Sequence, residues 1–294
     1  MITVLTPTYN RGYCLENLYI SLRNQSDKAF EWIVIDDGST DDTETKVTVW
    51  AGETKDFSIR YFKQKNGGKH RAVNYGVTLA RGQYTFIVDS DDRLTEDCIY
   101  KINGWIQEID SDSSYAGVSG VKGRNKDSII GSFPSNMCYI DASNIERARL
   151  GLLGDKAEVY RTNILRAYPF PEFEDERFLP ENVVWDEIAH DGYKLRWHGD
   201  VIYICEYLED GLTNNSNSLI KTSFNGYTLA KKKAFHYYPS PTKWGALLSY
   251  MYDAKSLGMG DWEIRESLEV SLKEYLAGKM MYGFWKIRKK MRKE

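Results

Sequence analysis

The chain has 294 residues, enough for one large α/β domain with an accessory piece, and it can bury a core without disulfide or metal staples. Its formal net charge of −3 gives no overall attraction for nucleic acid, so no nucleic-acid partner is expected. The four cysteines form no CxxC pair, which argues against a zinc knuckle or a disulfide framework and fits a reduced, cytoplasmic protein.

In the first half of the chain, short β-branched or aromatic runs alternate with amphipathic stretches, the pattern of βα units around a mostly parallel sheet. The periodicity predicts strands at residues 2–6, 32–35, 58–62 and 84–88, and helices at 15–24, 41–50 and 71–81. Ligands of open α/β sheets bind beyond the carboxyl ends of the strands. The candidate ligand contacts are therefore the segments 7–11, 36–41, 65–70 and 89–93.

Beyond about residue 110 the pattern becomes irregular, and the Gly-rich, polar stretch 117–132 is predicted to form a surface that shapes an acceptor site. A helix is expected over 180–190, because Pro180 suits a first turn and apolar residues recur on one side. Strands are expected at 194–197 and 201–205.

From residue 218 onward, helix-like stretches are separated by prolines at 239 and 241 and by glycines at 258 and 260. This pattern predicts a helical appendage, with domains at 1–215 and 216–294. We expect neither a cleaved signal sequence nor a membrane span, since no stretch of about 18 apolar residues occurs.

The strongest cluster of chemistry-bearing residues is Asp89-Ser90-Asp91-Asp92, three carboxylates directly after a hydrophobic strand. Hard divalent cations prefer oxygen ligands, and Mg²⁺ or Mn²⁺ is commonly held by one or two carboxylates together with substrate phosphates. The spacing suits a metal–diphosphate clamp that uses Asp91, Asp89 and Asp92. An acidic turn that caps the next helix is the alternative interpretation of the same residues.

Two other polar segments follow predicted strands. In the turn 36–41, Asp37 can accept hydrogen bonds from a ribose or a base ring N–H, and Gly38 lets the backbone turn sharply. Helix capping by Thr40 or Asp41 is compatible with that contact. The segment 66–71, Asn-Gly-Gly-Lys-His-Arg, combines flexible backbone with three potential cations, so it can face phosphate or form an ordinary turn before a helix.

Taken together, four motifs resemble the family 2 glycosyltransferases: Thr-Pro-Thr-Tyr-Asn-Arg at 6–11, Asp-Asp-Gly-Ser at 36–39, Asn-Gly-Gly-Lys-His-Arg-Ala-Val-Asn-Tyr-Gly at 66–76, and Asp-Ser-Asp-Asp at 89–92. The resemblance covers residues 1 to about 110 and extends more loosely to about 215. It implies a GT-A fold, which is Rossmann-like with a mostly parallel sheet. It also implies a nucleotide-sugar donor, usually UDP-linked, a divalent metal (Mn²⁺ or Mg²⁺) and inversion at the anomeric carbon.

Within that resemblance, residues 1–110 form the donor-binding half and residues 111–215 the acceptor-binding half. The Tyr9 ring matches a position that stacks on the base, Asp37 matches the base-binding acid, and Asp89 and Asp91 match the Asp-x-Asp pair. Asp92 is a further metal candidate, because family members differ in which acid touches the metal. The implied donor-binding set is Thr8, Tyr9, Asp37, Gly68, Arg71, Asn74, Asp89 and Ser90.

Inverting transfer needs a carboxylate that removes the acceptor hydroxyl proton on the face opposite the leaving diphosphate. The family usually shows a Glu-Asp pair at the start of a helix, and the matching stretch here is Glu181-Asn182, with Asn in place of Asp. We predict Glu181 as the base, with Asp186 second and Glu187 third. The alternative role for Glu181 is to complement the helix dipole.

Several further residues are weaker candidates. The stretch 209–213, Glu-Asp-Gly-Leu-Thr, resembles the loop that closes over the donor diphosphate in relatives. His198 is a possible metal ligand, although a lone histidine is more often structural. Three aromatic residues could stack on sugars, although core packing is the commoner role: Trp185, Trp197 and Tyr207.

The last stretch, 275–294, mixes apolar side chains with a run of lysines and arginines, the composition of an interfacial helix attracted to anionic lipid. A solvated helix end with favourably placed lysines is the plain alternative. Since many members of the family act on lipid-linked acceptors, we expect a saccharide or lipid-linked glycan acceptor. For the same reason we expect a cytoplasmic protein that can contact the inner face of the cell membrane.

The resemblance favours a role in surface-polysaccharide or glycoconjugate synthesis, and four other functions are alternatives. A non-catalytic nucleotide-sugar or glycan-binding protein of the same fold is suggested by Asn182, but the intact acids argue against it. A phosphatase would usually carry its Asp-x-Asp after the first strand, and a dinucleotide oxidoreductase needs a Gly-x-Gly-x-x-Gly turn that is not present. A nucleotidyltransferase could use the same metal clamp but would need a nucleoside triphosphate.

Overall fold

The structure, a computed structural model, describes residues 1–206 and 222–291, with side chains up to residue 283. Two compact units are formed, one from Met1 to Thr222 and one from Ser223 to Glu294. The boundary predicted at residue 215 lies outside the described residues, and each unit is described by itself.

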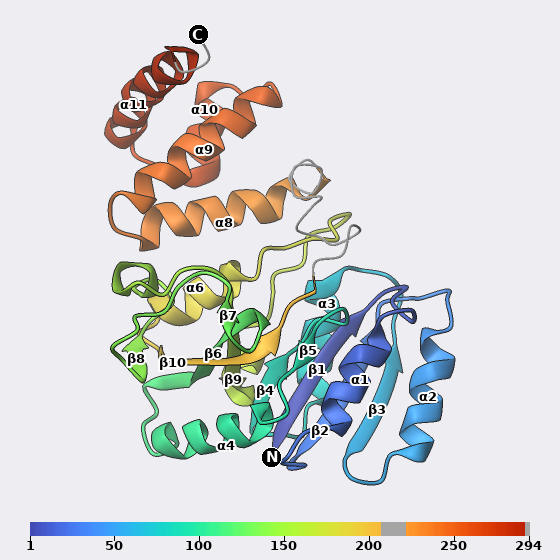
Figure 1. Ribbon diagram of the computed structural model, residues 1–294. Coiled ribbons are helices and arrows are strands. Elements are labelled where there is room, and N and C mark those ends of the chain that lie inside the picture. The colour runs from blue at the N-terminus through green and yellow to red at the C-terminus, as the bar shows by residue number, and fades with distance from the viewer. Residues whose placement is uncertain (207–221, 292–294) are drawn as a thin grey trace. The chain divides into compact units, whose positions relative to one another are not determined.

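The first unit is built on one ten-stranded sheet with the order β3-β2-β1-β4-β9-β6-β10-β5, in which β7 pairs with β6 and β8 with β10 (Figure 1). Parallel pairs join β1 to both β2 and β4, β2 to β3, and β6 to β10, whereas β9 runs antiparallel to β4 and β6. The strands are β1 (Ile2–Thr8), β2 (Phe30–Asp36), β3 (Ser58–Lys63), β4 (Tyr84–Ile87), β5 (Arg93–Leu94), β6 (Tyr115–Asn125), β7 (Ser128–Ile129), β8 (Tyr139–Ala142), β9 (Lys156–Arg161) and β10 (Lys194–Ile204).

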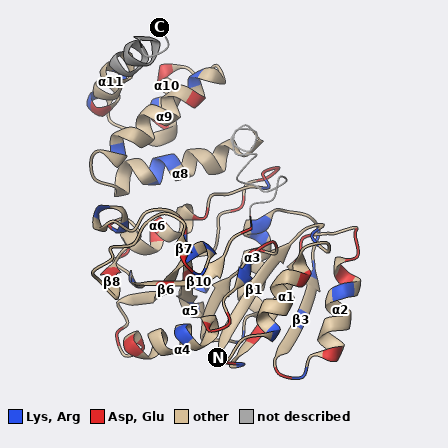
Figure 2. Cartoon of the chain, in the orientation of Figure 1, with Lys and Arg blue, Asp and Glu red and all other residues tan. Residues whose placement is uncertain are grey.

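Helices connect these strands, as the alternating pattern of the sequence predicts. They are α1 (Leu15–Arg23), α2 (Thr43–Glu53), α3 (Lys69–Leu79), α4 (Cys98–Ile109), α5 (Thr162–Ala167) and α6 (Asn182–His190), with a short 3-10 helix at Arg147–Leu150. Every strand and helix predicted in the first ninety residues is present, with shifts only at the ends. On the solvent side, α2 carries charges of both signs along its length (Figure 2).

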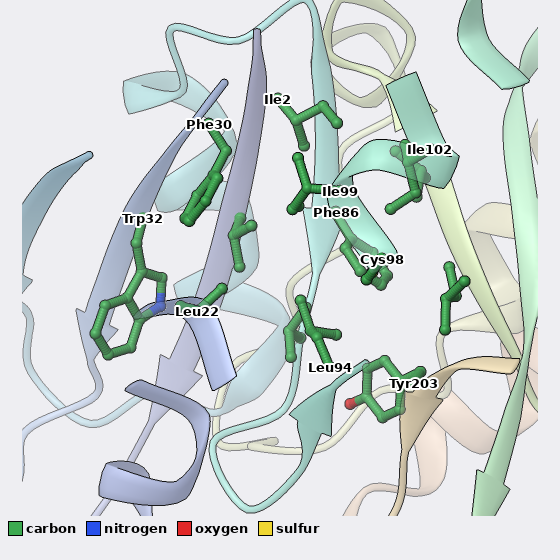
Figure 3. Packing of buried hydrophobic residues seen from close by; sticks show 14 of the residues in the cluster. Ile2, Leu22, Phe30, Trp32, Phe86, Leu94, Cys98, Ile99, Ile102 and Tyr203 are labelled. Carbon is green, nitrogen blue, oxygen red and sulfur yellow. The ribbon is translucent and has the colours of Figure 1, made fainter. Parts of the chain in front are cut away.

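The main core lies where the β1, β2 and β4 strands meet α1 and α4 (Figure 3). Ile2, Trp32 and Phe86 point from the strands into this cluster and are at most 1% exposed. Trp32 also donates a 3.0 Å hydrogen bond to the Thr6 hydroxyl, so its only polar atom is satisfied. Full burial of each such side chain contributes about 1.5–3 kcal/mol, which holds the ends of β1, β2 and β4 in place.

The expectation of an irregular surface at 117–132 is wrong, because most of this stretch is the central strand β6. Its glycines are needed for close packing rather than for flexibility. A Cβ on Gly117 would lie 1.9 Å from the Val159 carbonyl oxygen, and one on Gly120 would lie 2.6 Å from the Ile202 side chain. Glycine-rich composition therefore hid a strand that packs tightly against its neighbours.

The two strands expected at 194–197 and 201–205 form one strand, β10, whose pairing with β6 changes register between Trp197 and Val201. This irregularity accounts for the interruption seen in the sequence pattern. The helix expected at 180–190 is α6. No prediction covers α4, although its apolar residues Ile99, Ile102 and Ile109 are all buried.

The second unit consists of α8 (Phe224–Tyr237), α9 (Thr242–Ser256), α10 (Asp261–Leu268) and α11 (Leu272–Met291), as the predicted helical appendage requires. The breaks between α8 and α9 and between α9 and α10 fall at the expected prolines and glycines, whereas the break between α10 and α11, at residues 269–271, was not predicted. Tyr250 and Leu268 are fully buried in its core. Among the described residues, no helix is both long enough and apolar enough to cross a membrane.

His198 is a buried structural residue in the first unit. Its ring stacks on Trp105 of α4 at 4.2 Å with an interplanar angle of 7°, and only 5% of the residue is exposed. The buried Nε2 atom has no hydrogen-bond partner among the described residues. Burial lowers the pKa of His198 to about 4, and the nearby carboxylates of Glu108 and Asp200 offset this only in part.

We predict that His198 makes the protein acid-sensitive. Because the folded pKa of about 4 lies below the ordinary 6.5, the unfolded state binds more protons in this window. The stability that neutral His198 contributes is complete above about pH 6.5 and is lost as the pH falls toward 4. The loss is at most about 3.5 kcal/mol, since one pKa unit corresponds to about 1.4 kcal/mol.

His198→Phe keeps a ring on Trp105 without a titrating group, so its unfolding free energy should fall less than that of the unmodified protein between about pH 7 and about pH 4.5. Urea unfolding at several pH values measures this. Substitution of the exposed His190 by Gln serves as the control and should keep the original slope. Equal slopes for His198→Phe and the unmodified protein would contradict the prediction.

Candidate active site

Hydrogen bonds join the segments that follow β1 and β2, so the first two predicted ligand segments do lie together. The Asp37 amide donates to the Thr8 carbonyl oxygen at 2.8 Å. The Asn10 amide donates to the Ser39 hydroxyl, and the Thr40 amide donates to the Asn10 side-chain oxygen, both at 2.8 Å. Parallel pairing of β1 with β2 brings these two strand ends side by side.

Asp37 holds the glycine-rich segment against the end of β2. Its carboxylate accepts hydrogen bonds from the Gln64 side-chain amide at 2.7 Å, the Gly67 amide at 2.9 Å and the Gly68 amide at 2.7 Å. A carboxylate offers about four lone-pair positions, so one more donor, such as a base ring N–H, can still be accepted. Asp37 therefore has a structural role that is compatible with the predicted ligand contact.

Gly68 is required by a close backbone approach. Its φ is +98°, and a Cβ there would lie 2.0 Å from the Arg177 carbonyl oxygen. The segment around Gly68 thus packs directly on the chain that leads into α6. This contact brings the predicted donor and acceptor halves together within the first unit.

Two residues at the end of β1 have groups available for a ligand. The Thr8 hydroxyl is buried and has no partner among the described residues, while Tyr9 is 49% exposed. A buried hydroxyl without a partner is uncommon in folded proteins and often marks a place where a ligand or water binds. Both residues are therefore positioned to meet a ligand at the strand end.

The acidic cluster 89–92 follows β4 and is held from two sides. The Asp89 amide donates to the Tyr203 hydroxyl at 3.0 Å, and the Asp92 carboxylate accepts from the Glu206 amide at 2.8 Å. The Asp89 carboxylate forms an ion pair with Lys69, the first residue of α3. The third predicted ligand segment is thereby tied to the fourth.

Mutual repulsion within this cluster shifts the pKa values of its carboxyl groups. Burial raises the pKa of both Asp91 and Asp92, and the negative charge of Asp89 raises them further, that of Asp92 to about 6. Burial also raises the pKa of Asp89, but Lys69 and Lys122 outweigh it, so that this pKa is lowered. Negative charge is therefore concentrated around Asp89, where a cation would be stabilised.

The donor set fits a hard divalent cation that shares its coordination with phosphate. Within residues 1–206 and 222–283, no three His, Cys, Asp or Glu side chains form a ready-made metal cage. Mg²⁺ and Mn²⁺ are commonly held by one or two carboxylates with substrate phosphates and water, so a complete protein cage is not needed. The all-oxygen cluster at 89–92 matches this chemistry better than it matches zinc.

Of the predicted bases, Glu181 and Asp186 differ in exposure. Glu181 caps the amino end of α6, its side chain is 42% exposed, and its Oε1 lies 2.9 Å from the Lys69 ammonium. Asp186 is fully buried one turn later, where it accepts a 3.2 Å hydrogen bond from Asn182. A carboxylate must reach the acceptor to take its proton, so the geometry favours Glu181 over Asp186.

Arg71 and Asn74, which were expected near the nucleotide, are engaged with the loop before α6. The Arg71 guanidinium donates to the carbonyl oxygens of Gly67, Glu176 and Phe173 at 2.7, 2.8 and 2.6 Å. The Asn74 side chain donates to the Phe170 carbonyl oxygen at 2.9 Å and accepts from the Phe170 amide at 2.8 Å. These side chains clamp α3 to residues 170–176.

Lys69, Lys122 and Tyr203 belong to the site, and of these the sequence indicated only Lys69, as one of three potential cations in the segment 66–71. The Lys122 ammonium lies 4.5 Å from the centre of the Tyr203 ring. Its burial would lower the lysine pKa, yet Asp89 outweighs this and the pKa is raised. Lys69 stands within the motif at 66–76, whereas Lys122 lies in the stretch for which an irregular surface is predicted.

Some predicted site residues lie elsewhere or outside the description. Trp185 stacks on Tyr160 at 4.4 Å in the core, and the Trp197 indole donates to the Ala142 carbonyl oxygen at 2.8 Å. Neither ring presents a stacking face for a sugar. The candidate loop 209–213 and Tyr207 fall outside the described residues.

Comparison with known proteins agrees with this geometry. A sequence model of glycosyl transferase family 2 matches residues 3–167. Glycosyltransferase GlyG of Streptococcus pneumoniae is 35% identical over 113 residues, which are 38% of this chain and 37% of GlyG. The poly(ribitol-phosphate) β-N-acetylglucosaminyltransferase TarS of Staphylococcus aureus is 27% identical over 168 residues, 56% of this chain and 28% of TarS. The matches thus span about a third of the length of these curated relatives.

Solved structures establish the fold class. Residues 1–349 of S. aureus TarS in complex with UDP-GlcNAc align with a TM-score of 0.62 at 20% identity, covering 93% of this chain and 77% of that one. The mannosyltransferase PcManGT of Pyrobaculum calidifontis, in complex with GDP-Man and Mn²⁺, aligns with a TM-score of 0.59 at 18% identity, covering 97% and 87%. The predicted GT-A fold with carboxyl-terminal helices is confirmed.

Arg71 provides a test of the clamp. Arg71→Met removes a guanidinium that donates to three backbone carbonyl oxygens. Each acceptor that stays buried without a donor destabilises the fold by up to about 1–3 kcal/mol. We expect the unfolding free energy of the ligand-free protein to fall by about 2–3 kcal/mol in urea titration. Lys65→Met, at an exposed position of the same segment, is the control and should change stability little. An unchanged ligand-free stability for Arg71→Met would show that the clamp is not a stabilising feature.

Proposed function

This chain belongs to glycosyl transferase family 2, and we propose that it transfers a sugar, with inversion, from a nucleoside-diphosphate donor to an acceptor hydroxyl. One observation carries the proposal: carboxylates with different tasks, Asp37, Asp89 and Glu181, meet around the Gly67-Gly68-Lys69 segment. Binding a charged diphosphate and removing a proton both need such groups within one site.

We infer that the donor is a UDP-sugar. Asp37 retains one acceptor position for a base ring N–H, the buried Thr8 hydroxyl has no partner in the described part of the chain, and Tyr9 offers an exposed ring for stacking. TarS has been solved with UDP-GlcNAc, and PcManGT with GDP-Man, so relatives of the fold accept different nucleotides. The assignment of uracil, and of any particular sugar, is a proposal for this chain.

Asp89 and Asp91, with Asp92 beside them, would hold Mn²⁺ or Mg²⁺ together with the donor diphosphate. A bound divalent cation neutralises the negative charge that develops on the leaving diphosphate. Burial and the charge of Asp89 raise the pKa values of Asp91 and Asp92. A bound cation would offset the repulsion between these carboxylates. Asp92 is in addition fixed by the Glu206 amide.

Glu181 is the proposed base. It accepts the acceptor hydroxyl proton while the acceptor oxygen forms a bond to the anomeric carbon and the bond from that carbon to the diphosphate breaks. The nucleoside diphosphate leaves with the bonding electrons. The Lys69 ammonium lies 2.9 Å from Oε1 of Glu181 and so fixes the direction of this carboxylate at the start of α6.

The acceptor is proposed to be a saccharide or a lipid-linked glycan in surface-polysaccharide or glycoconjugate synthesis. In the described part of α11, Leu272, Leu276 and Met280 recur at helical spacing, and each is at least 51% exposed. An exposed apolar stripe next to a lysine- and arginine-rich end supports peripheral contact with an anionic membrane surface. That contact and a cytoplasmic location remain predictions.

The main alternative is a nucleotide-sugar or glycan-binding protein that has lost its base, because Asn182 stands where the family usually has Asp. Glu181 directly precedes it and is exposed beside Lys69, so a carboxylate is still present at this helix start. The two functions differ in turnover, not in donor binding.

Donor binding is tested by thermal unfolding with a panel of nucleoside diphosphates. A ligand that binds only the native state at about 100 times its Kd adds about 2.7 kcal/mol, which raises the Tm by several degrees. We expect UDP with Mn²⁺ or Mg²⁺ to give this shift, and chelator or Asp91→Asn to remove it. Asp56→Asn, an exposed acid before β3, is the matched control and should keep the shift. If no nucleotide shifts the Tm with metal present, the transferase proposal fails.

The base is tested by three substitutions measured for transfer and for UDP-induced stabilisation. Glu181→Gln should lower kcat by about 10²-fold or more while the UDP-induced shift in Tm is retained, because it removes proton acceptance but not donor contacts. Asp186→Asn should mainly lower stability, and Glu187→Gln should change little. Loss of turnover with intact binding in either of these, rather than in Glu181→Gln, would move the base to that residue.

A further inference from the structure

Lys69 bridges two carboxylates that the proposed reaction uses at different ends of the site. Its ammonium forms an ion pair with Asp89, beyond β4, and lies 2.9 Å from Oε1 of Glu181, the amino-terminal cap of α6. Asp89 and Glu181 are 92 residues apart in sequence, and the Lys69 ammonium pairs with both of them. The Lys69 side chain is 28% exposed, which leaves the bridge accessible from the solvent side.

The position of Lys69 is set by its surroundings rather than by chance rotation of an exposed side chain. Gly68, the preceding residue, packs against the Arg177 carbonyl oxygen, where a Cβ would lie at 2.0 Å. Arg71, two residues later, is clamped to Glu176 and Phe173. The backbone on both sides of Lys69 is therefore anchored to the chain that carries Glu181.

In this ligand-free structure the Lys69 ammonium already forms an ion pair with the Asp89 carboxylate. A divalent cation that binds Asp89 must compete with Lys69 for the same carboxylate, because two cations that share one carboxylate repel each other. Once the divalent cation holds Asp89, Glu181 is the remaining carboxylate partner of Lys69. The ion pair of Lys69 with Asp89 therefore opposes metal binding, whereas its ion pair with Glu181 can persist after the metal has bound.

We propose that Lys69 is a positioning residue that couples donor loading to the base: it occupies Asp89 until the metal and diphosphate displace it, and then it pairs with Glu181 alone. This inference rests on the proposed glycosyl transfer and adds an order of events to it. In the free protein the bridge weakens metal binding in the absence of nucleotide. In the loaded protein Lys69 holds the Glu181 side chain in place, directed toward the strand ends.

The proposed competition predicts that removing Lys69 strengthens metal binding, whereas loss of a purely structural residue would not. Removing a positive charge from a metal site by Lys69→Met should tighten binding of Mn²⁺ alone by about tenfold, as expected for one unit charge a few ångströms away. A lysine that only stabilised the fold would leave Mn²⁺ affinity unchanged or weaken it when removed. The probe is Mn²⁺ in the absence of nucleotide, measured from the electron paramagnetic resonance signal of free Mn²⁺.

Lys101→Met is a closely matched control. Lys101 also bridges two carboxylates, Asp97 at 2.9 Å and Asp200 at 3.0 Å, but it joins α4 to β10 and is not among the proposed site residues. The substitution removes the same charge and the same kind of bridge. We expect Mn²⁺ affinity and transfer by this variant to match those of the unmodified protein.

Transfer kinetics test the second half of the proposal. Lys69→Met should lower kcat by about tenfold or more, with a smaller change in the KM for the donor, because Glu181 loses the partner that orients it. Lys69→Arg, which keeps the charge, should restore Mn²⁺ affinity to the original value and recover part of kcat. A merely structural lysine would show neither the opposite change in metal affinity nor the rescue.

Two outcomes would overturn the inference, and they differ in what else they affect. If the protein binds UDP with Mn²⁺ but Lys69→Met binds Mn²⁺ alone no more tightly than the unmodified chain, the competition is absent and the proposed transfer stands. If neither the unmodified protein nor any variant binds Mn²⁺ or UDP, the proposed function fails and this inference fails with it.

Discussion

Parallel pairing of β1 with both of its neighbours is the constraint on which the rest of this site depends. Leu5 of β1 pairs with Ile33 of β2 on one side and with Ile87 of β4 on the other, so all three strands end at the same edge of the sheet. The chain after each strand is polar, and these polar segments must therefore share one region of space. Buried aliphatic and aromatic side chains beneath them hold that edge rigid.

The second half of the site reaches this edge through α3 and the chain before α6. Gly68 allows backbone contact with Arg177, Arg71 clamps the same chain through its carbonyl oxygens, and Lys69 adds the ion pair to Glu181. Three features meet in this short segment: Asp37 anchors it, its backbone packs on the neighbouring loop, and its lysine links a candidate metal ligand to the candidate base. A change of conformation in this segment would reach both ends of the site at once.

Prediction from sequence succeeded where local pattern and chain order were enough. The strands and helices of the first ninety residues and the helical appendage follow from periodicity and turn residues, and the acids at 37 and 89–92 lie at strand ends as expected. It failed at β6, where Gly117 and Gly120 were interpreted as signs of an irregular surface. Those glycines are present because Val159 and Ile202 approach too closely for any side chain. Such a contact depends on a partner far along the chain, and local pattern cannot show it.

The sequence by itself determined the fold class, the family and which acids stand after which strands, because these depend on short-range pattern and on motif spacing. Only the tertiary structure decided how the polar groups are used. Asp37 is engaged with Gln64, Gly67 and Gly68, and Arg71 is engaged with the loop at 170–176. Lys69 joins Asp89 to Glu181. Hydrogen bonds and ion pairs act over a few ångströms, so their partners are chosen by the packing of distant segments and not by neighbours in sequence.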